Sequence, residues 1–167
     1  MSKRLAWVIG SMAGVGYLKP APGTWGSLAA LPLAWLLHVI GGFPLLALAT
    51  IAVFLKGWWA TAEIIRDSDN HDPSEIVIDE VAGQFIALIP LSWSAWRMDL
   101  DITALWPGWI AAFVLFRLFD ITKPGPIGWA DRRGDALGVM LDDVIAGVFA
   151  ALSVVLLAGL AHGVFKL

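Results

Sequence analysis

The chain has 167 residues, of which 59% are hydrophobic and 15% are charged, and its net charge is −3. Soluble domains carry about 25% charged residues, so this composition predicts a membrane protein with room for one domain, residues 1–167. The lack of cysteine excludes disulfides, zinc–thiolate sites, iron–sulfur clusters and cysteine nucleophiles. No basic stripe with interleaved aromatic residues occurs, which argues against nucleic acid as a partner.

The first apolar segment runs over residues 28–55 and is interrupted by Pro32 and by a Gly-Gly-Phe-Pro sequence at 41–44. Each half has about 13 residues, or about 20 Å of helix, whereas a bilayer core is about 30 Å thick. Gly-Gly-Phe-Pro is a strong helix breaker. We therefore predict a helical hairpin that is either re-entrant or packed tightly against its neighbours.

Three further apolar segments lie at residues 81–96, 104–119 and 144–165. Four tryptophans flank the polar turn between the first two of them, as in an interfacial aromatic belt: Trp93, Trp96, Trp106 and Trp109. The last segment, with about 22 residues, is long enough to span a bilayer. No segment alternates with the two-residue period of a strand. The expected fold is all-α: a membrane-embedded multihelical bundle with a broken first hydrophobic hairpin and about three further transmembrane helices.

Two hairpins of this kind place residues 1–27, 56–80 and 120–143 on one side of the membrane. That side carries most of the basic residues: Lys3, Arg4, Lys19, Lys56, Arg66, Lys123, Arg132 and Arg133. The opposite side keeps Arg97 and Lys166. Because basic residues are enriched in cytoplasmic loops, the first side is predicted to face the cytoplasm.

Two acidic pairs, Asp79-Glu80 and Asp142-Asp143, stand at the thresholds of apolar segments. Carboxylates near hydrocarbon are costly unless a charge compensates them. Oxygen-only ligands favour Mg²⁺ or a similar hard cation. Gly83 and Gly147, each one turn further along, would let the two helices approach closely enough for the pairs to share one site. The alternative is that both pairs occupy solvated helix starts, the first behind a Ser74 cap.

Other polar residues on the same side are candidates for phosphate binding. Lys19 and Thr24 flank a Pro-Gly turn into the first helix, where free backbone N–H groups attract anions. Asp120 and Lys123 either join the metal and the phosphate or pair only with each other. Arg132 is a further phosphate candidate, and its alternative role is to touch anionic lipid head groups.

The sequence Asp-Leu-Asp-Ile-Thr at 99–103 fits the D-x-D-x-T pattern of aspartyl-phosphate phosphatases. That chemistry requires a strand end in a doubly wound α/β domain, which the surrounding sequence does not supply. The predicted topology also places this motif on the side opposite the acidic pairs. We therefore expect no catalytic role for it.

Taken together, the motifs resemble the phosphatidylglycerophosphatase A family in order and spacing over most of residues 10–150. They are Pro-Gly-Thr-Trp-Gly-Ser at 22–27, Ile-Asp-Glu-Val-Ala-Gly at 78–83, Phe-Arg-Leu-Phe-Asp at 116–120 with Lys-Pro at 123–124, and Gly-Val-Met-Leu-Asp-Asp at 138–143 with Ala-Gly at 146–147. The chain departs from the family at Asp135-Ala136, where members tend to have a Gly-Gly pair.

The resemblance implies a Mg²⁺-dependent lipid phosphatase of the bacterial inner (cytoplasmic) membrane, with its active site facing the cytoplasm. Its reaction would convert phosphatidylglycerophosphate to phosphatidylglycerol and phosphate. On this hypothesis Asp79, Glu80, Asp142 and Asp143 are catalytic and hold one or two Mg²⁺ ions, with Asp120 as a further ligand. Lys19, Thr24, Lys123 and Arg132 would bind the phosphate, and Asp79 would accept a proton from the attacking water.

Three alternatives remain open at this point. One is a small cation-binding membrane transporter, which the broken first segment would suit. A second is a phosphatase for another lipid phosphomonoester, and a third is a soluble helical enzyme rich in tryptophan. A transporter should carry acidic residues deep within its spans, whereas the acidic pairs here lie at the edges.

Overall fold

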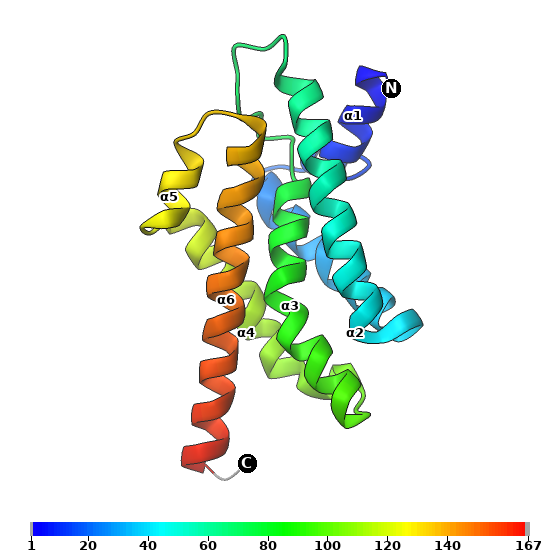
Figure 1. The fold of residues 1–167 in the computed structure, drawn as a ribbon, viewed down its shortest axis with the longest axis vertical. Coiled ribbons are helices and arrows are strands. Elements are labelled where there is room, and N and C mark those ends of the chain that lie inside the picture. The colour runs from blue at the N-terminus through cyan, green and yellow to red at the C-terminus, as the bar shows by residue number, and fades with distance from the viewer. Residues whose placement is uncertain (1, 166–167) are drawn as a thin grey trace.

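The structure, a computed structural model, describes the backbone of residues 2–165 and the side chains up to residue 161, so Lys166 lies outside it. Within that part every regular element is a helix, which confirms the all-α prediction. The α-helices form an elongated bundle (Figure 1). In chain order the elements are α1 (Lys3–Gly10), η1 (Val15–Tyr17), α2 (Pro22–Ile65), α3 (Ile78–Met98), η2 (Ile102–Leu105), α4 (Trp106–Thr122), α5 (Pro126–Asp131) and α6 (Ala136–Phe165).

The broken first hairpin is present, because α2 contains two residues with non-helical dihedral angles, Gly41 and Gly42. Gly42 has a φ of 62°, and a Cβ there would lie 2.5 Å from the Trp96 ring, so a side chain is excluded on both counts. The legs are longer than predicted, since Pro22 begins the helix and Ile65 ends it. At about 1.5 Å per residue, the legs of about 19 and 23 residues are about 28 and 34 Å long, enough for each to cross a bilayer.

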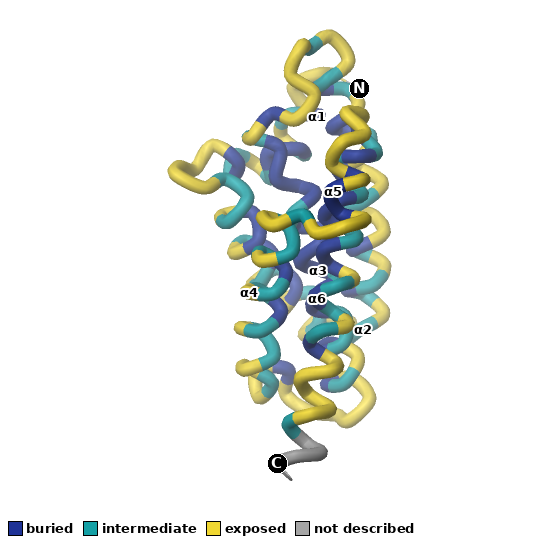
Figure 2. The backbone as a smooth tube through the Cα atoms, turned by 90° about the vertical axis from the view of Figure 1, so that its left-hand side faces the viewer, coloured by how far each residue is buried: buried dark blue, intermediate teal, exposed yellow. Residues whose placement is uncertain are grey.

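Helix α3 lies at the centre of the bundle and packs against α2 and α6. Figure 2 shows most of its backbone as buried, in contrast to the outer helices. The crossing with α6 depends on two glycines: a Cβ on Gly147 would lie 2.3 Å from the Gly83 carbonyl oxygen, and one on Gly83 would lie 2.6 Å from the Asp143 carbonyl oxygen. The predicted close approach at Gly83 and Gly147 is therefore confirmed.

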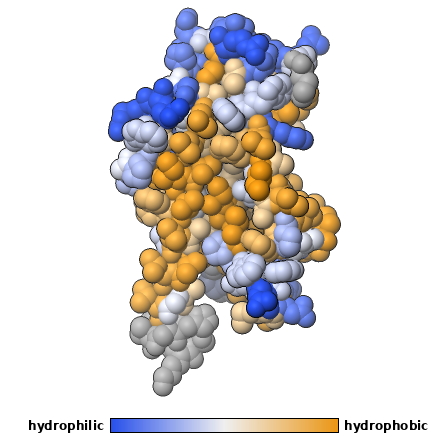
Figure 3. Space-filling model, in the orientation of Figure 1, coloured by the Kyte–Doolittle hydropathy of each residue, from blue (hydrophilic) through white to orange (hydrophobic). Residues whose placement is uncertain are grey.

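An apolar belt crosses the middle of the face shown in Figure 3, with hydrophilic residues above and below it. Large apolar side chains on the outer helices are more than half exposed at i, i+4, i+8 spacing, such as Ile110 (56%), Val114 (54%) and Leu118 (51%) on α4. Three stretches are long and apolar enough to cross a membrane: residues 22–65, 102–122 and 136–161. Such a surface is unstable in water and suits hydrocarbon.

The turn between α3 and η2 lies at the end of the bundle away from the acidic pairs, since Asp79 begins α3 and Asp99 caps its other end. Asp101 accepts hydrogen bonds from the backbone N–H and the hydroxyl of Thr103, at 2.8 and 2.7 Å. Its carboxylate therefore caps the η2 helix. The D-x-D-x-T motif is thus a turn and cap motif.

Replacing Gly147 by alanine should weaken the α3–α6 crossing, because the new methyl group meets a backbone carbonyl that cannot move cheaply. Overpacking of this kind costs about 1–3 kcal/mol, so the thermal unfolding midpoint in detergent should fall by at least about 2 °C. Gly159→Ala on the same helix is the matched control, since nothing lies within 4 Å of its Cβ position. An unchanged midpoint for Gly147→Ala would contradict the proposed role of this crossing.

Candidate functional site

Three helix segments bring the candidate acidic residues together: the first turn of α3, the second turn of α6 and the last turns of α4. The α3 helix begins at Ile78, and not after Ser74 as the sequence suggested, because the Val77 N–H bonds to the Gly10 carbonyl at 2.9 Å and ties this segment to α1. The α6 helix begins earlier than predicted, at Ala136, because Asp135 caps it by accepting from the Gly138 N–H at 2.7 Å.

These helix boundaries change the interpretation of the second acidic pair. Asp142 and Asp143 lie well inside α6, and only 6% and 3% of their surfaces are exposed. Asp79, in the first turn of α3, is likewise only 6% exposed. The solvated-helix-start alternative is therefore wrong for these three residues. Burial of this degree requires compensation by cations or protons.

The tightest cluster consists of Asp79, Glu80 and Asp143, whose carboxylate oxygens lie within 4.8 Å of one another. Glu80 Oε2 and Asp143 Oδ1 are buried and have no hydrogen-bond partner among the described residues. Buried carboxylates this close repel each other strongly unless a positive charge lies between them. The oxygen-only donor set fits a hard divalent cation such as Mg²⁺ or Mn²⁺.

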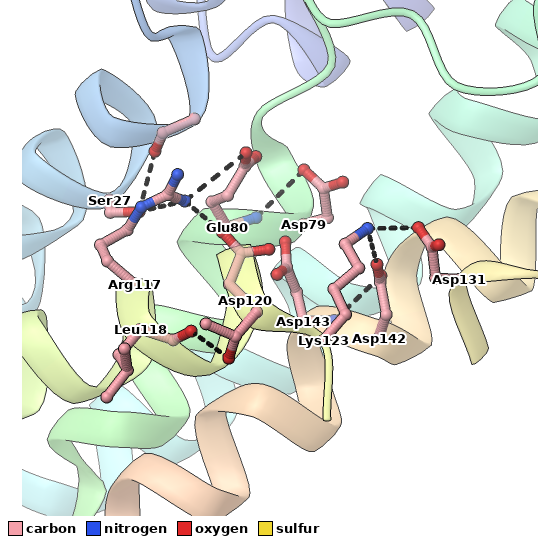
Figure 4. A network of polar contacts seen from close by, with 12 residues as sticks. Ser27, Asp79, Glu80, Arg117, Leu118, Asp120, Lys123, Asp131, Asp142 and Asp143 are labelled. Carbon is pink, nitrogen blue, oxygen red and sulfur yellow. Dashed lines mark hydrogen bonds and ion pairs between the residues drawn. The ribbon is translucent and has the colours of Figure 1, made fainter. Parts of the chain in front are cut away.

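Two basic side chains compensate part of this negative charge (Figure 4). Arg117, on α4, forms an ion pair with Asp120 one turn along and lies 3.9 Å from Glu80 Oε1. Its guanidinium also donates to Ser27 Oγ of α2, at 3.4 Å. Gly23 leaves room for this arrangement, because a Cβ there would lie 2.0 Å from Glu80 Oε1 and would displace that carboxylate.

The second basic side chain is Lys123, which ends α4 in a left-handed conformation before Pro124. Its ammonium donates to Asp142 Oδ2 at 2.9 Å and to Asp131 of α5. Partial burial would lower the pKa of Lys123, but the hydrogen bonds to Asp131 and Asp142 outweigh it and raise that pKa above its ordinary value. Lys123 thus stays charged and holds α5 against α6, and the alternative in which it pairs only with Asp120 is wrong.

A cavity of about 360 Å³ opens above these carboxylates. Its walls come from residues 21–23, 71–80 and 117–143. Six of the predicted site residues line it: Asp79, Glu80, Asp120, Lys123, Asp142 and Asp143. Three other predicted phosphate-binding residues, Lys19, Thr24 and Arg132, do not line it.

The structure adds site residues to which the sequence analysis gave no role. Arg117 and Asp131 line the cavity as counter-ions, and Gly23 provides the space that Glu80 occupies. One local signal was available for Arg117, because it precedes Asp120 by three residues on a helix. Its contacts with Ser27 and Glu80 join distant segments and have no signature in a single sequence.

Comparison with known proteins gives a consistent result. A family model described as Phosphatidylglycerophosphatase A matches residues 8–158. The phosphatidylglycerophosphatase A of Haemophilus influenzae is 38% identical over 142 residues, covering 84% of this chain and 81% of that protein. The phosphatidylglycerophosphatase A of Escherichia coli is 36% identical over 140 residues, covering 83% and 74%. A Bacteroides thetaiotaomicron protein, provisionally named a phosphatidylinositol-3-phosphatase, is 36% identical over 148 residues, covering 86% and 87%. No solved structure is significantly similar.

If the carboxylate cluster is a cation site, Asp143→Asn should weaken Mn²⁺ binding, measured by electron paramagnetic resonance of the detergent-solubilised protein. Loss of an outer-shell group typically costs 10–100-fold in metal affinity, so loss of a direct ligand should cost at least about tenfold. Asp101→Asn serves as the control, because asparagine caps a helix as well as aspartate and this site is at the other end of the bundle. Equal Mn²⁺ affinity in the two variants would argue against a metal at Asp143.

Proposed function

Because this chain belongs to the phosphatidylglycerophosphatase A family, we propose that it hydrolyses phosphatidylglycerophosphate to phosphatidylglycerol and phosphate with Mg²⁺ as cofactor. The family makes the chain a lipid phosphomonoesterase. We further propose that it lies in the bacterial inner membrane with the cavity on the cytoplasmic side, as the basic loops at that end favour. The transporter and soluble-enzyme alternatives have no support from this family.

One observation supports the metal-dependent chemistry most directly: two buried carboxylates and one partly buried carboxylate converge at the wall of a polar cavity, and two of the three have an oxygen without a partner among the described residues. Asp79, Glu80 and Asp143 are the residues that would hold Mg²⁺, with Asp142 and Asp120 beside them. When bound, Mg²⁺ would offset phosphate charge and lower the pKa of a nearby water. The donor set fits this ion because every ligand is a hard carboxylate oxygen.

The remaining steps belong to side chains of this chain. Asp79 is proposed to accept the proton of the attacking water, since the Glu80 N–H donates to Asp79 Oδ1 at 3.0 Å and fixes the carboxylate at the cavity wall. The water oxygen forms a bond to phosphorus, the P–O bond to the glycerol breaks, and the leaving oxygen takes up a proton. The Lys123 ammonium has three N–H donors, and two of them are taken up by its two carboxylate partners. The third donor remains a proposed contact for the phosphate.

The position of the cavity suits a lipid substrate. It lies at the end of the bundle that carries the acidic pairs, and Asp120, Ile121 and Lys123 place its wall at the end of the apolar stretch 102–122. The diacylglycerol tails can therefore stay in the bilayer while the head group reaches the carboxylates. Embedding in the membrane would then give the site direct access to a substrate that resides in the bilayer.

A second substrate class is supported by one specific comparison. The B. thetaiotaomicron relative covers as much of this chain as the other two relatives, and its provisional name gives a phosphoinositide as substrate. A phosphoinositide also presents a phosphomonoester next to diacylglycerol tails. Because the carboxylate cluster would act on the phosphate and not on the alcohol, it does not discriminate between the two substrates.

A substrate panel tests both proposals. Purified protein in detergent should release phosphate from phosphatidylglycerophosphate in the presence of Mg²⁺, and excess chelator should abolish the release. Phosphatidylinositol 3-phosphate and phosphatidic acid should react at least about tenfold more slowly in kcat/KM, a difference of about 1.4 kcal/mol in barrier. A faster reaction with the phosphoinositide would replace the proposed substrate, and full activity in chelator would refute the metal role.

Asp79→Asn and Asp143→Asn should each lower kcat by at least about tenfold on that substrate, since each removes a charge from the cluster. Asp99→Asn is the matched control: it makes the same change at an exposed site with a φ of 52°, which asparagine tolerates. Retention of activity within about threefold of wild type, or about 0.7 kcal/mol, in the two site variants would refute their roles.

A further inference from the structure

The contacts of Arg117 all use one nitrogen of its guanidinium group. Nη1 donates to Ser27 Oγ, pairs with Asp120 and faces Glu80. Nε is buried and has no hydrogen-bond partner among the described residues. No contact of Nη2 with a described residue is found either. Nη1 therefore makes the polar contacts of this guanidinium, whereas the Nε–Nη2 edge forms no hydrogen bond or ion pair with a described residue.

The Nε–Nη2 edge has a defined chemistry. In a planar guanidinium the N–H of Nε and one N–H of Nη2 point in the same direction and form a fork that fits two oxygens of a phosphate or carboxylate. A buried N–H left without a partner costs about 1–3 kcal/mol. The three groups on Nη1 hold the plane of the side chain, so the fork is oriented before any ligand arrives.

The surroundings restrict which ligand this fork can take. Arg117 lines the same cavity as the carboxylate cluster, and its side chain is only 15% exposed. The first turn of α2 also lines the cavity, and its residue 23 has no side chain that would block the approach to Glu80. A phosphomonoester could contact both Arg117 and a cation held by the cluster, and these two positive charges would offset its repulsion by the nearby carboxylates.

We propose that the Nε–Nη2 edge of Arg117 binds two oxygens of the phosphomonoester and makes Arg117 the principal phosphate-binding side chain of this site. The inference rests on the proposed phosphatase function and adds a residue to it. Lys123 is a weaker candidate for this role, because an ammonium group lacks the planar fork that fits two phosphate oxygens. Lys19 and Arg132 do not line the cavity.

The test compares wild type with Arg117→Lys, which keeps the charge and removes the fork. Arg97→Lys is the matched control, because Arg97 stacks over Trp93 at the far end of the bundle. For each protein the competitive Ki of inorganic phosphate and the Mg²⁺ concentration for half-maximal activity are measured. Arg117→Lys should raise the phosphate Ki and the substrate KM at least about tenfold while the Mg²⁺ requirement stays within about threefold. A purely structural Arg117 would instead disturb Glu80 and change the Mg²⁺ requirement.

A phosphate Ki within about twofold of wild type in Arg117→Lys would overturn the inference and leave the phosphatase proposal intact. If wild type hydrolyses no lipid phosphomonoester, the phosphatase proposal fails. The affinity of wild type, Arg117→Lys and Arg97→Lys for inorganic phosphate in the presence of Mg²⁺, measured by calorimetry, then still tests the role of the Arg117 fork. Should Arg117→Lys not fold, phenylglyoxal labelling of wild type decides. Phosphate with Mg²⁺ should reduce labelling at Arg117 and not at Arg97, and unchanged labelling at Arg117 would overturn the inference.

Discussion

The contact on which the site depends is the crossing of α3 and α6 at Gly83 and Gly147. A methyl group on either glycine would collide with the backbone of the other helix. Because the carboxylates of Asp79 and Glu80 lie one turn before Gly83, and that of Asp143 one turn before Gly147, the crossing sets the distance between them. Lipid tails are as apolar as the side chains of membrane helices, so no hydrophobic driving force brings such helices together. Their association depends instead on the close packing that small residues allow. The charge density of the site is thus a consequence of the packing.

Charge compensation in the site comes from the end of α4. Arg117 faces Asp120 and Glu80, and Lys123 faces Asp131 and Asp142, so each cation joins groups from different helices. The central cluster around Asp143 keeps unpartnered oxygens. The carboxylates of Asp120, Asp131 and Asp142 are neutralised by basic side chains of the protein, whereas the unpartnered oxygens of the central cluster remain available to a metal ion.

Much of the fold could be read from the sequence, since the features that determine it are local. Gly-Gly-Phe-Pro at 41–44 predicted the turn within α2, and the paired glycines predicted the α3–α6 contact. The start of α6 was placed too late, because hydropathy rises only at residue 144 whereas the Asp135 cap starts the helix eight residues earlier. The partners of Arg117 and Lys123 were missed for a different reason: they depend on which helices become neighbours, and a single sequence does not encode that in any local pattern.

The walls of the cavity come from loops and from parts of α2, α3, α4, α5 and α6 near one pole of the bundle. One turn deeper, Phe85, Phe116 and Ala146 are buried in close packing. We expect this packing to close the cavity on the side of the bundle interior. Under the proposed function, the reaction products would then leave through the opening by which the substrate entered, into the same compartment and the same leaflet. Such chemistry is non-vectorial: it changes the identity of a head group without moving anything across the membrane.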